Sequence, residues 1–503
     1  MTAPSTPAGI AFAAPHPSAL AAATEVVTDG GGVIDAAVAA AAALTVAYPH
    51  QCSLGGDLVA LIRTPAGRVQ AVLSIGAAAA ATDVAALRAA GDRMPAGGPQ
   101  TVTVPGVVAG WAALAGLGAK LSLARLLGPA SELARTGVPV SAGLARAAIA
   151  RRAVLQADPG LAALLLADSG VPVPPGTVLR QPALARTLAT VGDDWRSFYQ
   201  GEVADQLAAG VQGLGGPLRV ADLQAHRAEL TEPLQLTTGA TTWSVAPPPS
   251  QGAALLAMLD AHADPLTTAH RAEQRRDALL GDPRCGPIDL AGLLLHRDAP
   301  APPAPVGPKP AGDTAAITVV GGDGTVVTLI QSVFQSFGAG ILEPTTGVVL
   351  HNRGSAFSLD PTHPGRLRPG ARPPHSLCPA VATAPGQLVA LGAQGGRAQP
   401  WILAQVAAAL TTGDPAGLLA QPRWVIGGRE LGRPEPSLVL EPDVPGADAL
   451  RATAARLGRA VTQWPARHDD AGHVQLARLT PAGLDAATDP RADGAAAVLP
   501  VPA

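Results

Sequence analysis

Charge is scarce in this 503-residue sequence, and its lysines and arginines are scattered. Charged residues make up 15% of the chain, against about 25% in ordinary domains, and alanine accounts for much of the difference. The net charge is −3, and no basic cluster is present that would attract a polyanion. We therefore expect no nucleic-acid partner.

Cysteine is also rare. Cys52, Cys285 and Cys378 are odd in number and form no C-x-x-C pair, which argues against a disulfide framework and favours a reducing compartment. The first positive side chain is Arg63, so the basic start of a secretory signal is missing. The apolar run from Ala36 to Ala47 is too short to span a bilayer. These features predict a cytoplasmic protein without a membrane partner.

Several common catalytic motifs are missing. The sequence has no H-E-x-x-H, no G-x-S-x-G and no G-K-[ST], and its histidines are scattered, mostly in apparent turns. Gly55-Gly56 lies between a predicted helix and a predicted strand, where it favours close packing of a loop over a sheet rather than phosphate binding. We expect no metal ion and no organic cofactor.

What the chain does contain is a helix-rich first half, strands in the middle and both later. Apolar residues make up 48% of the sequence, which is ample for a large core. The length corresponds to about three domains or to one large layered fold. Hydrophobic periodicity and turn residues predict an α+β protein. The expected helices include 18–28, 35–47, 268–280, 401–410 and 447–457, and the expected strands include 58–63, 69–75, 234–245, 314–320 and 325–334.

One stretch organises the rest. The segment from Ala299 to Pro310 holds six prolines in twelve residues, which predicts an exposed linker. It leads into Gly312-Asp313-Thr314, followed by a β-branched run and the turn Gly321 to Gly324. On these residues alone, the simplest interpretation is a domain boundary, with Thr314 serving only as a good strand former.

Further motifs follow one another along nearly the whole chain. They are His16-Pro17, Gly30-Gly31, Asp35 to Val38, Leu54 to Asp57, Pro105-Gly106, Pro247 to Gly252, Gly312-Asp313-Thr314, Gly322 to Gly324, Phe337 to Gly340, Asn352-Arg353-Gly354, Phe357 to Asp360, Gly395-Gly396 and Thr488 to Gly494. In this ordered set the sequence resembles the gamma-glutamyltransferase family of N-terminal nucleophile hydrolases. The resemblance implies a four-layer αββα sandwich. It also implies cleavage into a large subunit, 1–313, which ends in the proline-rich linker 299–313, and a small catalytic subunit, 314–503, the two forming one intertwined domain.

The resemblance also implies a chemistry. Thr314 attacks the carbonyl of Asp313, the ester hydrolyses, and Thr314 gains a free α-amine. An amine with an ordinary pKa near 8 can act as the base for the hydroxyl beside it. Gly395 and Gly396 correspond to the oxyanion hole, and Ser332 to the hydroxyl that assists the nucleophile.

The sequence departs from the family pattern where glutamyl substrates are bound. Where glutamyl-specific members of the family carry an arginine for the glutamyl carboxylate, this sequence has Ser74. Where they carry an aspartate for the glutamyl amine, it has Ala356. The usual asparagine is Phe334, and the usual Ser-Ser pair is His375-Ser376. Losing both charges argues against tight glutathione recognition.

The residues around Arg353 look more like the branch that contains oxamate amidohydrolase and cephalosporin acylases. Arg353 or His375 could meet a substrate carboxylate, with Ser376 beside them. Alternatively, both are loop residues that bond to backbone.

Three functions remain open at this point. The first is a self-processing N-terminal-threonine amidohydrolase or acyltransferase that cleaves a small amide through an acyl-enzyme. The second is a true gamma-glutamyltransferase or glutathione hydrolase. The third is an unprocessed, inactive member that acts as a binding or structural protein. For the first two, the partners are a small amide or γ-glutamyl-type substrate, with water or an amine as acceptor.

Overall fold

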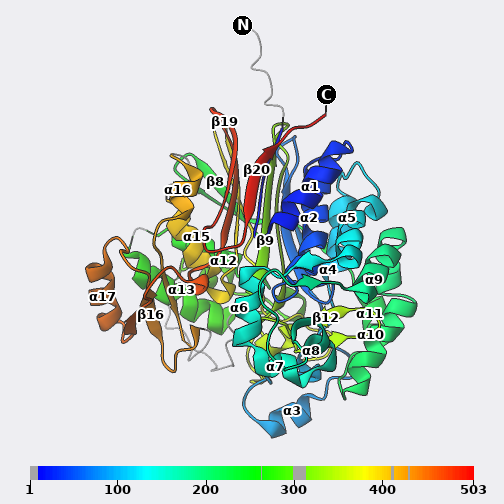
Figure 1. The fold of residues 1–503 in the computed structure, drawn as a ribbon. Coiled ribbons are helices and arrows are strands. Elements are labelled where there is room, and N and C mark those ends of the chain that lie inside the picture. The colour runs from blue at the N-terminus through cyan, green and yellow to red at the C-terminus, as the bar shows by residue number, and fades with distance from the viewer. Residues whose placement is uncertain are drawn as a thin grey trace.

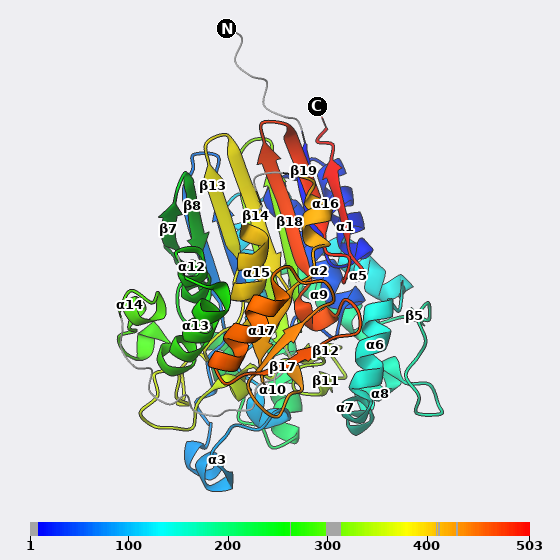
Figure 2. The same cartoon turned by 90° about the vertical axis from the view of Figure 1, so that its left-hand side faces the viewer.

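Two stacked β-sheets form the centre of the protein, and helices cover the outer face of each (Figures 1 and 2). The structure is a computed structural model that describes residues 9–261, 263–297, 313–408, 410, 413–428 and 431–502. It confirms the expected α+β class and the four-layer αββα sandwich. The proline-rich segment 299–310 lies outside the described residues.

The first sheet has seven strands in the order β20-β1-β9-β10-β2-β3-β6, all antiparallel to their neighbours. Its members come from both sides of Asp313, because β9, β10 and β20 lie among strands from the first half of the chain. The strands are β1 (Ile10–Ala14), β2 (Asp57–Arg63), β3 (Val69–Ser74), β6 (Glu229–Thr231), β9 (Asp313–Gly321), β10 (Val326–Phe334) and β20 (Ala495–Leu499).

The second sheet has six antiparallel strands in the order β19-β18-β14-β13-β8-β7. They are β7 (Leu234–Thr238), β8 (Thr241–Val245), β13 (Ala380–Ala384), β14 (Gln387–Ala393), β18 (Val474–Thr480) and β19 (Gly483–Thr488). Short strands outside the sandwich form smaller sheets. These are β4 (Val138–Pro139), β5 (Val178–Leu179), β11 (Ile341–Glu343), β12 (Val348–Leu350), β15 (Trp424–Gly427), β16 (Ser437–Leu440) and β17 (Ala460–Gln463).

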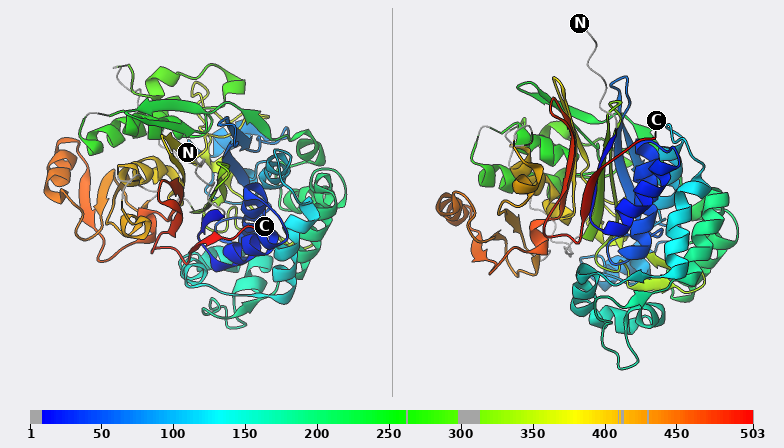
Figure 3. Two further views of the ribbon diagram at one scale, coloured as in Figure 1. Left: turned by 90° about the horizontal axis from the view of Figure 1, so that it is seen from above. Right: turned by 45° about the horizontal axis from the view of Figure 1, so that its top comes forward.

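Helices α1, α2 and α4 pack on the first sheet, with α5 and α9 outside them, whereas α12, α15 and α16 pack on the second (Figure 3). The helices are α1 (Pro17–Thr28), α2 (Val33–Ala47), α3 (Val84–Ala90), α4 (Val107–Ala115), α5 (Leu123–Thr136), α6 (Ala142–Ala150), α7 (Arg152–Ala157), α8 (Pro159–Leu165), α9 (Pro182–Asp193), α10 (Glu202–Gly213), α11 (Val220–Ala225), α12 (Gly252–Leu259), α13 (Pro265–Leu279), α14 (Leu290–Leu293), α15 (Gln399–Ala407), α16 (Pro415–Leu419) and α17 (Ala447–Arg456). Each expected helix matches one of these, with ends shifted by a few residues. The expected strands match β2, β3, β9 and β10, and the region 234–245 forms the two strands β7 and β8.

Helix α2 explains part of the unusual composition. Its 15 residues are mostly alanine, and side chains along the whole helix are buried. Alanine has the highest helix propensity, and its small side chain lets a helix lie close to a sheet on one side and to α1 and α5 on the other. Asp35 fixes the start of the helix, because its carboxylate accepts hydrogen bonds from the N–H groups of Gly32 (2.8 Å) and Leu121 (2.9 Å).

The space between the sheets receives every second side chain of β9. A Cβ atom built on Gly392 of β14 would lie 3.1 Å from the Cβ of Ala316, so Ala316 faces the second sheet. Because side chains alternate along a strand, Thr314 and Thr318 face the same way, whereas Ala315 and Ile317 belong to the core under α2. Thr314, which follows Asp313 at the start of β9, therefore has its hydroxyl directed between the sheets.

Candidate active site

Thr314 and Ser332 form a pair on neighbouring strands. The β9–β10 register sets Gln331 opposite Ala315, and continuing it by one residue sets Ser332 opposite Thr314. The Thr314 hydroxyl donates a hydrogen bond to the Ser332 hydroxyl, with 3.4 Å between the oxygens. Both residues are buried, Thr314 with 1% of its surface exposed. The pairing places a second hydroxyl where it can orient the threonine oxygen.

A bulge in β10 follows Ser332 at once. The register shifts by one residue before Phe334 pairs with Asp313, and Phe334 adopts a φ of 80°, a left-handed conformation that is uncommon for residues other than glycine. The Phe334 N–H donates to the Ser332 hydroxyl at 2.8 Å. The bulge therefore fixes the orientation of Ser332 and turns the ring of Phe334 toward the site.

Asp57 extends this row onto the next strand. It pairs with Ser332 across β2 and β10, and its side chain is fully buried. One carboxylate oxygen accepts the N–H of Gly76 at 2.9 Å, and the other lies 3.2 Å from Nε2 of His375 and 3.5 Å from Nδ1 of His351. Burial raises the pKa of Asp57 above its ordinary value and lowers the pKa values of both histidines, that of His351 to about 4. The imidazoles are therefore neutral near neutral pH.

Arg353 brings a cation to the same place. Its guanidinium carbon lies 3.5 Å from the centroid of the Phe334 ring, in cation–π contact. Its terminal nitrogens donate to the Ser376 hydroxyl at 3.1 Å and to the Pro374 carbonyl at 2.7 Å. The Nε atom has no hydrogen-bond partner among the described residues. Burial lowers the pKa of Arg353, but guanidinium remains charged near neutral pH.

The glycine pair, Gly395 and Gly396, lies just after the end of β14. Gly395 has a φ of 146° and Gly396 a φ of 50°, both in the left-handed region that glycine tolerates. The turn precedes α15, so the pair lies near the positive end of a helix dipole. Gln251 links the turn to the segment that holds Arg353, since its amide donates to the carbonyls of Gly396 (2.9 Å) and Ser376 (2.6 Å).

The two positions that fall on glutamyl-binding residues carry no charge toward a ligand. The Ser74 hydroxyl donates to the carbonyl of Gly106 at 2.6 Å and lies 3.2 Å from Nε2 of His226. Ala356 ends a short 3-10 helix that begins at Arg353. The structure thus brings Arg353, His375 and Ser376 together near Phe334, and it leaves Ser74 bonded to backbone beside His226.

Asp57, His351 and Gln251 are residues of this region that sequence reasoning did not identify as members of the site. Asp57 lies within the motif Leu54 to Asp57, and Gln251 lies within the motif Pro247 to Gly252, but nothing in these motifs indicates a role for either side chain. Within the described ranges, no cluster of three or more histidine, cysteine or acidic residues could hold a metal ion. No helix in the same ranges is long and apolar enough to cross a membrane.

The family model for gamma-glutamyltranspeptidase matches residues 19–499. The chain belongs to the gamma-glutamyltranspeptidase family. It is 40% identical to the oxamate amidohydrolase proenzyme of Klebsiella pneumoniae, across 96% of this chain and 97% of that protein. It is 33% identical to the glutathione hydrolase-like YwrD proenzyme of Bacillus subtilis, across 82% and 84%. Among solved structures, cephalosporin acylase from Bacillus halodurans superposes with a TM-score of 0.85 at 28% identity, across 99% of each chain.

These relatives confirm the predicted family and its branch. Two of them are named as proenzymes, and the family acts on amide bonds as hydrolases and transferases. This chain therefore belongs to a family of hydrolases and transferases that act on amides.

Proposed function

We propose that this protein cleaves itself between Asp313 and Thr314 and that Thr314 then hydrolyses a small amide that carries a carboxylate. The observation that carries the first part is the position of Thr314. It lies near the start of β9, directly after the proline-rich segment, with its hydroxyl paired to that of Ser332. The names of the proenzyme relatives support the same interpretation.

The self-cleavage step is an acyl shift. The Thr314 oxygen adds to the carbonyl carbon of Asp313 and loses its proton, the C–N bond breaks, and the nitrogen takes up a proton to become an amine. Water then hydrolyses the ester, which frees the Asp313 carboxylate and restores the threonine hydroxyl. Fragments 1–313 and 314–503 stay together, because the first sheet interleaves strands from both and their separation would expose its core.

The mature reaction uses the same oxygen. The free amine of Thr314 takes the hydroxyl proton, the oxygen attacks the substrate amide carbonyl, and the proton passes to the leaving amine. Ser332 orients the nucleophile. The N–H groups of Gly395 and Gly396 stabilise the oxyanion, a contribution for which loss of one donor costs on the order of a hundredfold in rate. Hydrolysis of the acyl-threonine completes the cycle.

Arg353 supports the choice of substrate. It is a buried cation with a nitrogen that has no partner among the described residues, and its other nitrogens are held by Ser376 and Pro374. Neither Ser74 nor Ala356 supplies a charge for a glutamyl group. A short amide whose carboxylate meets Arg353 fits this arrangement, and oxamate, the substrate in the name of the Klebsiella relative, is the smallest example.

Electrophoresis under denaturing conditions tests the cleavage. The purified chain should give two bands, and N-terminal sequencing of the smaller should begin at Thr314. The variant Thr314→Ala should give one band of full length. If the unaltered protein stays a single band through prolonged incubation, the protein is the unprocessed, inactive member and the proposal is wrong.

Matched amides test the substrate class. Oxamate should be hydrolysed to oxalate and ammonia, whereas its neutral counterpart oxamide should react far more slowly, since it lacks the carboxylate. A γ-glutamyl anilide is the third substrate. Preference for the anilide would establish a glutathione-hydrolase activity instead, and equal rates on oxamate and oxamide would remove Arg353 from substrate binding.

A further inference from the structure

The segment from Thr488 to Gly494 is a motif for which the proposed chemistry supplies no role. Two of its charged residues are nonetheless buried, since Asp489 is completely buried and Arg491 is only 6% exposed. Burying charges is expensive, and an apolar replacement often serves stability equally well. These charges therefore call for an explanation other than stability.

Asp489 holds a second buried arginine, Arg423, in an ion pair. Arg423 in turn donates to two successive carbonyls, those of Ala471 at 2.9 Å and Gly472 at 2.8 Å. A carboxylate oxygen of Asp489 accepts the N–H of Val474 at 3.1 Å. Asp489 and Arg423 together fix the backbone of the turn 471–474 from both ends.

That turn is joined to the residue before the glycine pair. The N–H of Gln394 donates to the carbonyl of His473 at 3.0 Å, and the N–H of His473 donates to the side-chain oxygen of Gln394 at 3.2 Å. A Cβ atom on Gly472 would lie 2.9 Å from the Gln394 carbonyl oxygen, so the two backbones touch. The position of Gln394 thus follows the position of the turn.

Packing transmits the same constraint to Gly395. A Cβ atom on Gly395 would lie 2.6 Å from Cδ1 of Ile402, and a Cβ atom on Gly472 would lie 2.8 Å from that same carbon. Gly395 and Gly472 therefore pack against one side chain, Ile402, so closely that a Cβ atom on either glycine would clash with it. A shift of the turn cannot occur without moving Ile402 or the glycine pair.

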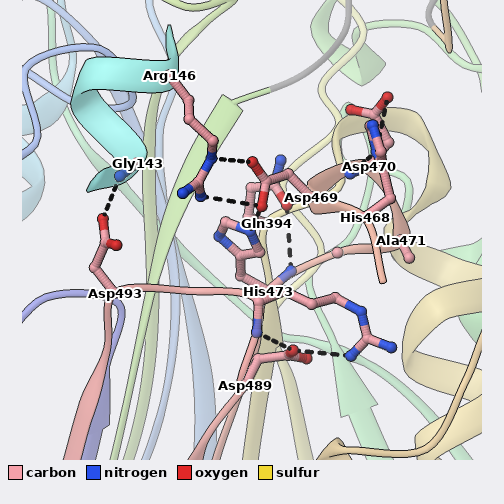
Figure 4. Close-up of polar contacts among 12 residues, drawn as sticks. Gly143, Arg146, Gln394, His468, Asp469, Asp470, Ala471, His473, Asp489 and Asp493 are labelled. Carbon is pink, nitrogen blue, oxygen red and sulfur yellow. Dashed lines mark hydrogen bonds and ion pairs between the residues drawn. The ribbon is translucent and has the colours of Figure 1, made fainter. Parts of the chain in front are cut away.

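The first half of the chain also holds this region (Figure 4). Arg146 of α6 pairs with Asp469 at 3.1 Å, just before the turn, and Asp493 accepts the N–H of Gly143 at 2.9 Å. His473 lies beside Asp469, with 3.3 Å between Nε2 and the carboxylate. The turn is thus held by residues that precede the proposed cleavage site in the chain as well as by residues that follow it.

We infer that Asp489 and Arg423 are positioning residues that hold Gly395 and Gly396 in place for catalysis. They act through the turn 471–474 and touch no substrate. The inference rests on the proposed role of the glycine pair as oxyanion hole. Because misplacement of reacting groups by about 1 Å costs on the order of a hundredfold, loosening the turn should lower kcat at least about tenfold and leave KM nearly unchanged.

Arg423→Lys tests this, with Arg478→Lys as its matched control. Arg478 is equally buried, pairs with Asp485 at 2.6 Å and donates to the carbonyl of Leu410 at 2.8 Å, but it contacts no part of the turn. Both variants lose a buried guanidinium that pairs with a carboxylate and donates to backbone carbonyls. We expect kcat to fall in Arg423→Lys alone. Equal kcat values for the two variants would overturn the inference.

Asp489→Asn is the second variant, because it keeps the side-chain shape if the lysine variant does not fold. Hydrogen–deuterium exchange of the peptide spanning Gln394 to Ala398 gives a readout that needs no activity. Exchange there should accelerate in Asp489→Asn and not in Arg478→Lys. An unaltered protein without amidase activity would refute the proposed function, whereas unchanged exchange in Asp489→Asn would refute the positioning role by itself.

Discussion

The guanidinium of Arg353 stacks on the ring of Phe334, with 3.5 Å between the guanidinium carbon and the ring centroid. By the resemblance, Phe334 occupies the position at which glutamyl-specific members of the family carry an asparagine. The bulge after Ser332 turns the Phe334 ring toward the site. An aromatic face can hold a guanidinium at a fixed angle without using its N–H groups. In the proposed function, this pair supplies the cation for a substrate carboxylate, because Ser74 and Ala356 carry no charge.

Arg353→Lys should raise KM for oxamate by about ten- to a hundredfold, the range expected when a charge-assisted hydrogen bond of about 1.5–3 kcal/mol is lost. Lysine keeps the charge, but it cannot stack flat on Phe334 while bonding to Ser376 and Pro374. Steady-state kinetics on oxamate and oxamide measure the effect. The neutral amide is the internal control, and a parallel rise in its KM would mean that the pocket itself had collapsed.

Ser332→Ala should slow both the appearance of the two fragments and amide hydrolysis by at least about tenfold, because the Thr314 oxygen loses the hydroxyl that orients it. Ser332→Thr should retain much of both rates. Ser244→Ala is the control, since Ser244 is also a buried strand serine, on β8 of the second sheet. If Ser332→Ala matched Ser244→Ala, the pairing with Thr314 would have no catalytic consequence.

The local elements were predictable because their signals are local. Alanine periodicity marked α2, and β-branched runs around Gly321 to Gly324 marked the hairpin of β9 and β10. Strand β1 was not predicted, since Ile10 to Ala14 is mostly alanine and acquires its strand conformation by pairing with β9 and β20. Its partner strands lie hundreds of residues away in the sequence, and local hydrophobic periodicity cannot predict such a pairing.

The site was predictable only as far as the resemblance extended. Thr314, Ser332 and the glycine pair were assigned from motif order. The contacts of Asp57 with His375 and of Arg353 with Ser376 depend on how three segments that are distant in the sequence meet. The stacking of Arg353 on Phe334 needs the bulge and the φ of 80° at Phe334. A single sequence carries no signal for a strained residue other than glycine, because tertiary packing supplies the energy that holds it.

Gly395→Ala should lower kcat by on the order of a hundredfold while the protein still folds. The new Cβ would lie 2.6 Å from Cδ1 of Ile402, so the turn and its N–H groups must shift. Gly386→Ala is the matched control. It also has a positive φ, 70°, in the turn after β13, but its Cβ would meet nothing closer than 3.7 Å. Alanine is strained at both positions, and more at the φ of 146° than at the φ of 70°. An equal loss of kcat in the two variants would argue against an oxyanion role.

The free energy of unfolding should fall as the pH drops below about 4. Burial alone would raise the pKa values of Asp489 and Glu441, but the adjacent Arg423 and Arg491 outweigh burial and hold both pKa values below the ordinary range. Below that pH, the carboxylates of Asp489 and Glu441 bind protons in the unfolded chain but stay ionised in the native protein. Stability therefore rises with pH there, by about 1.4 kcal/mol per pH unit for each such group.

The variant Glu441→Gln distinguishes this effect from acid denaturation caused by other groups. Near neutral pH the variant should be less stable by about 3–5 kcal/mol, because Arg491 loses one of its two buried carboxylate partners. As the pH falls toward 2, Glu441 of the unaltered protein also becomes protonated, so the difference between the two proteins should shrink. Urea unfolding of both proteins at a series of pH values measures it. A difference that stays constant down to pH 2 would mean that the pKa of Glu441 is not depressed, and that its pairing with Arg491 contributes nothing that depends on its charge.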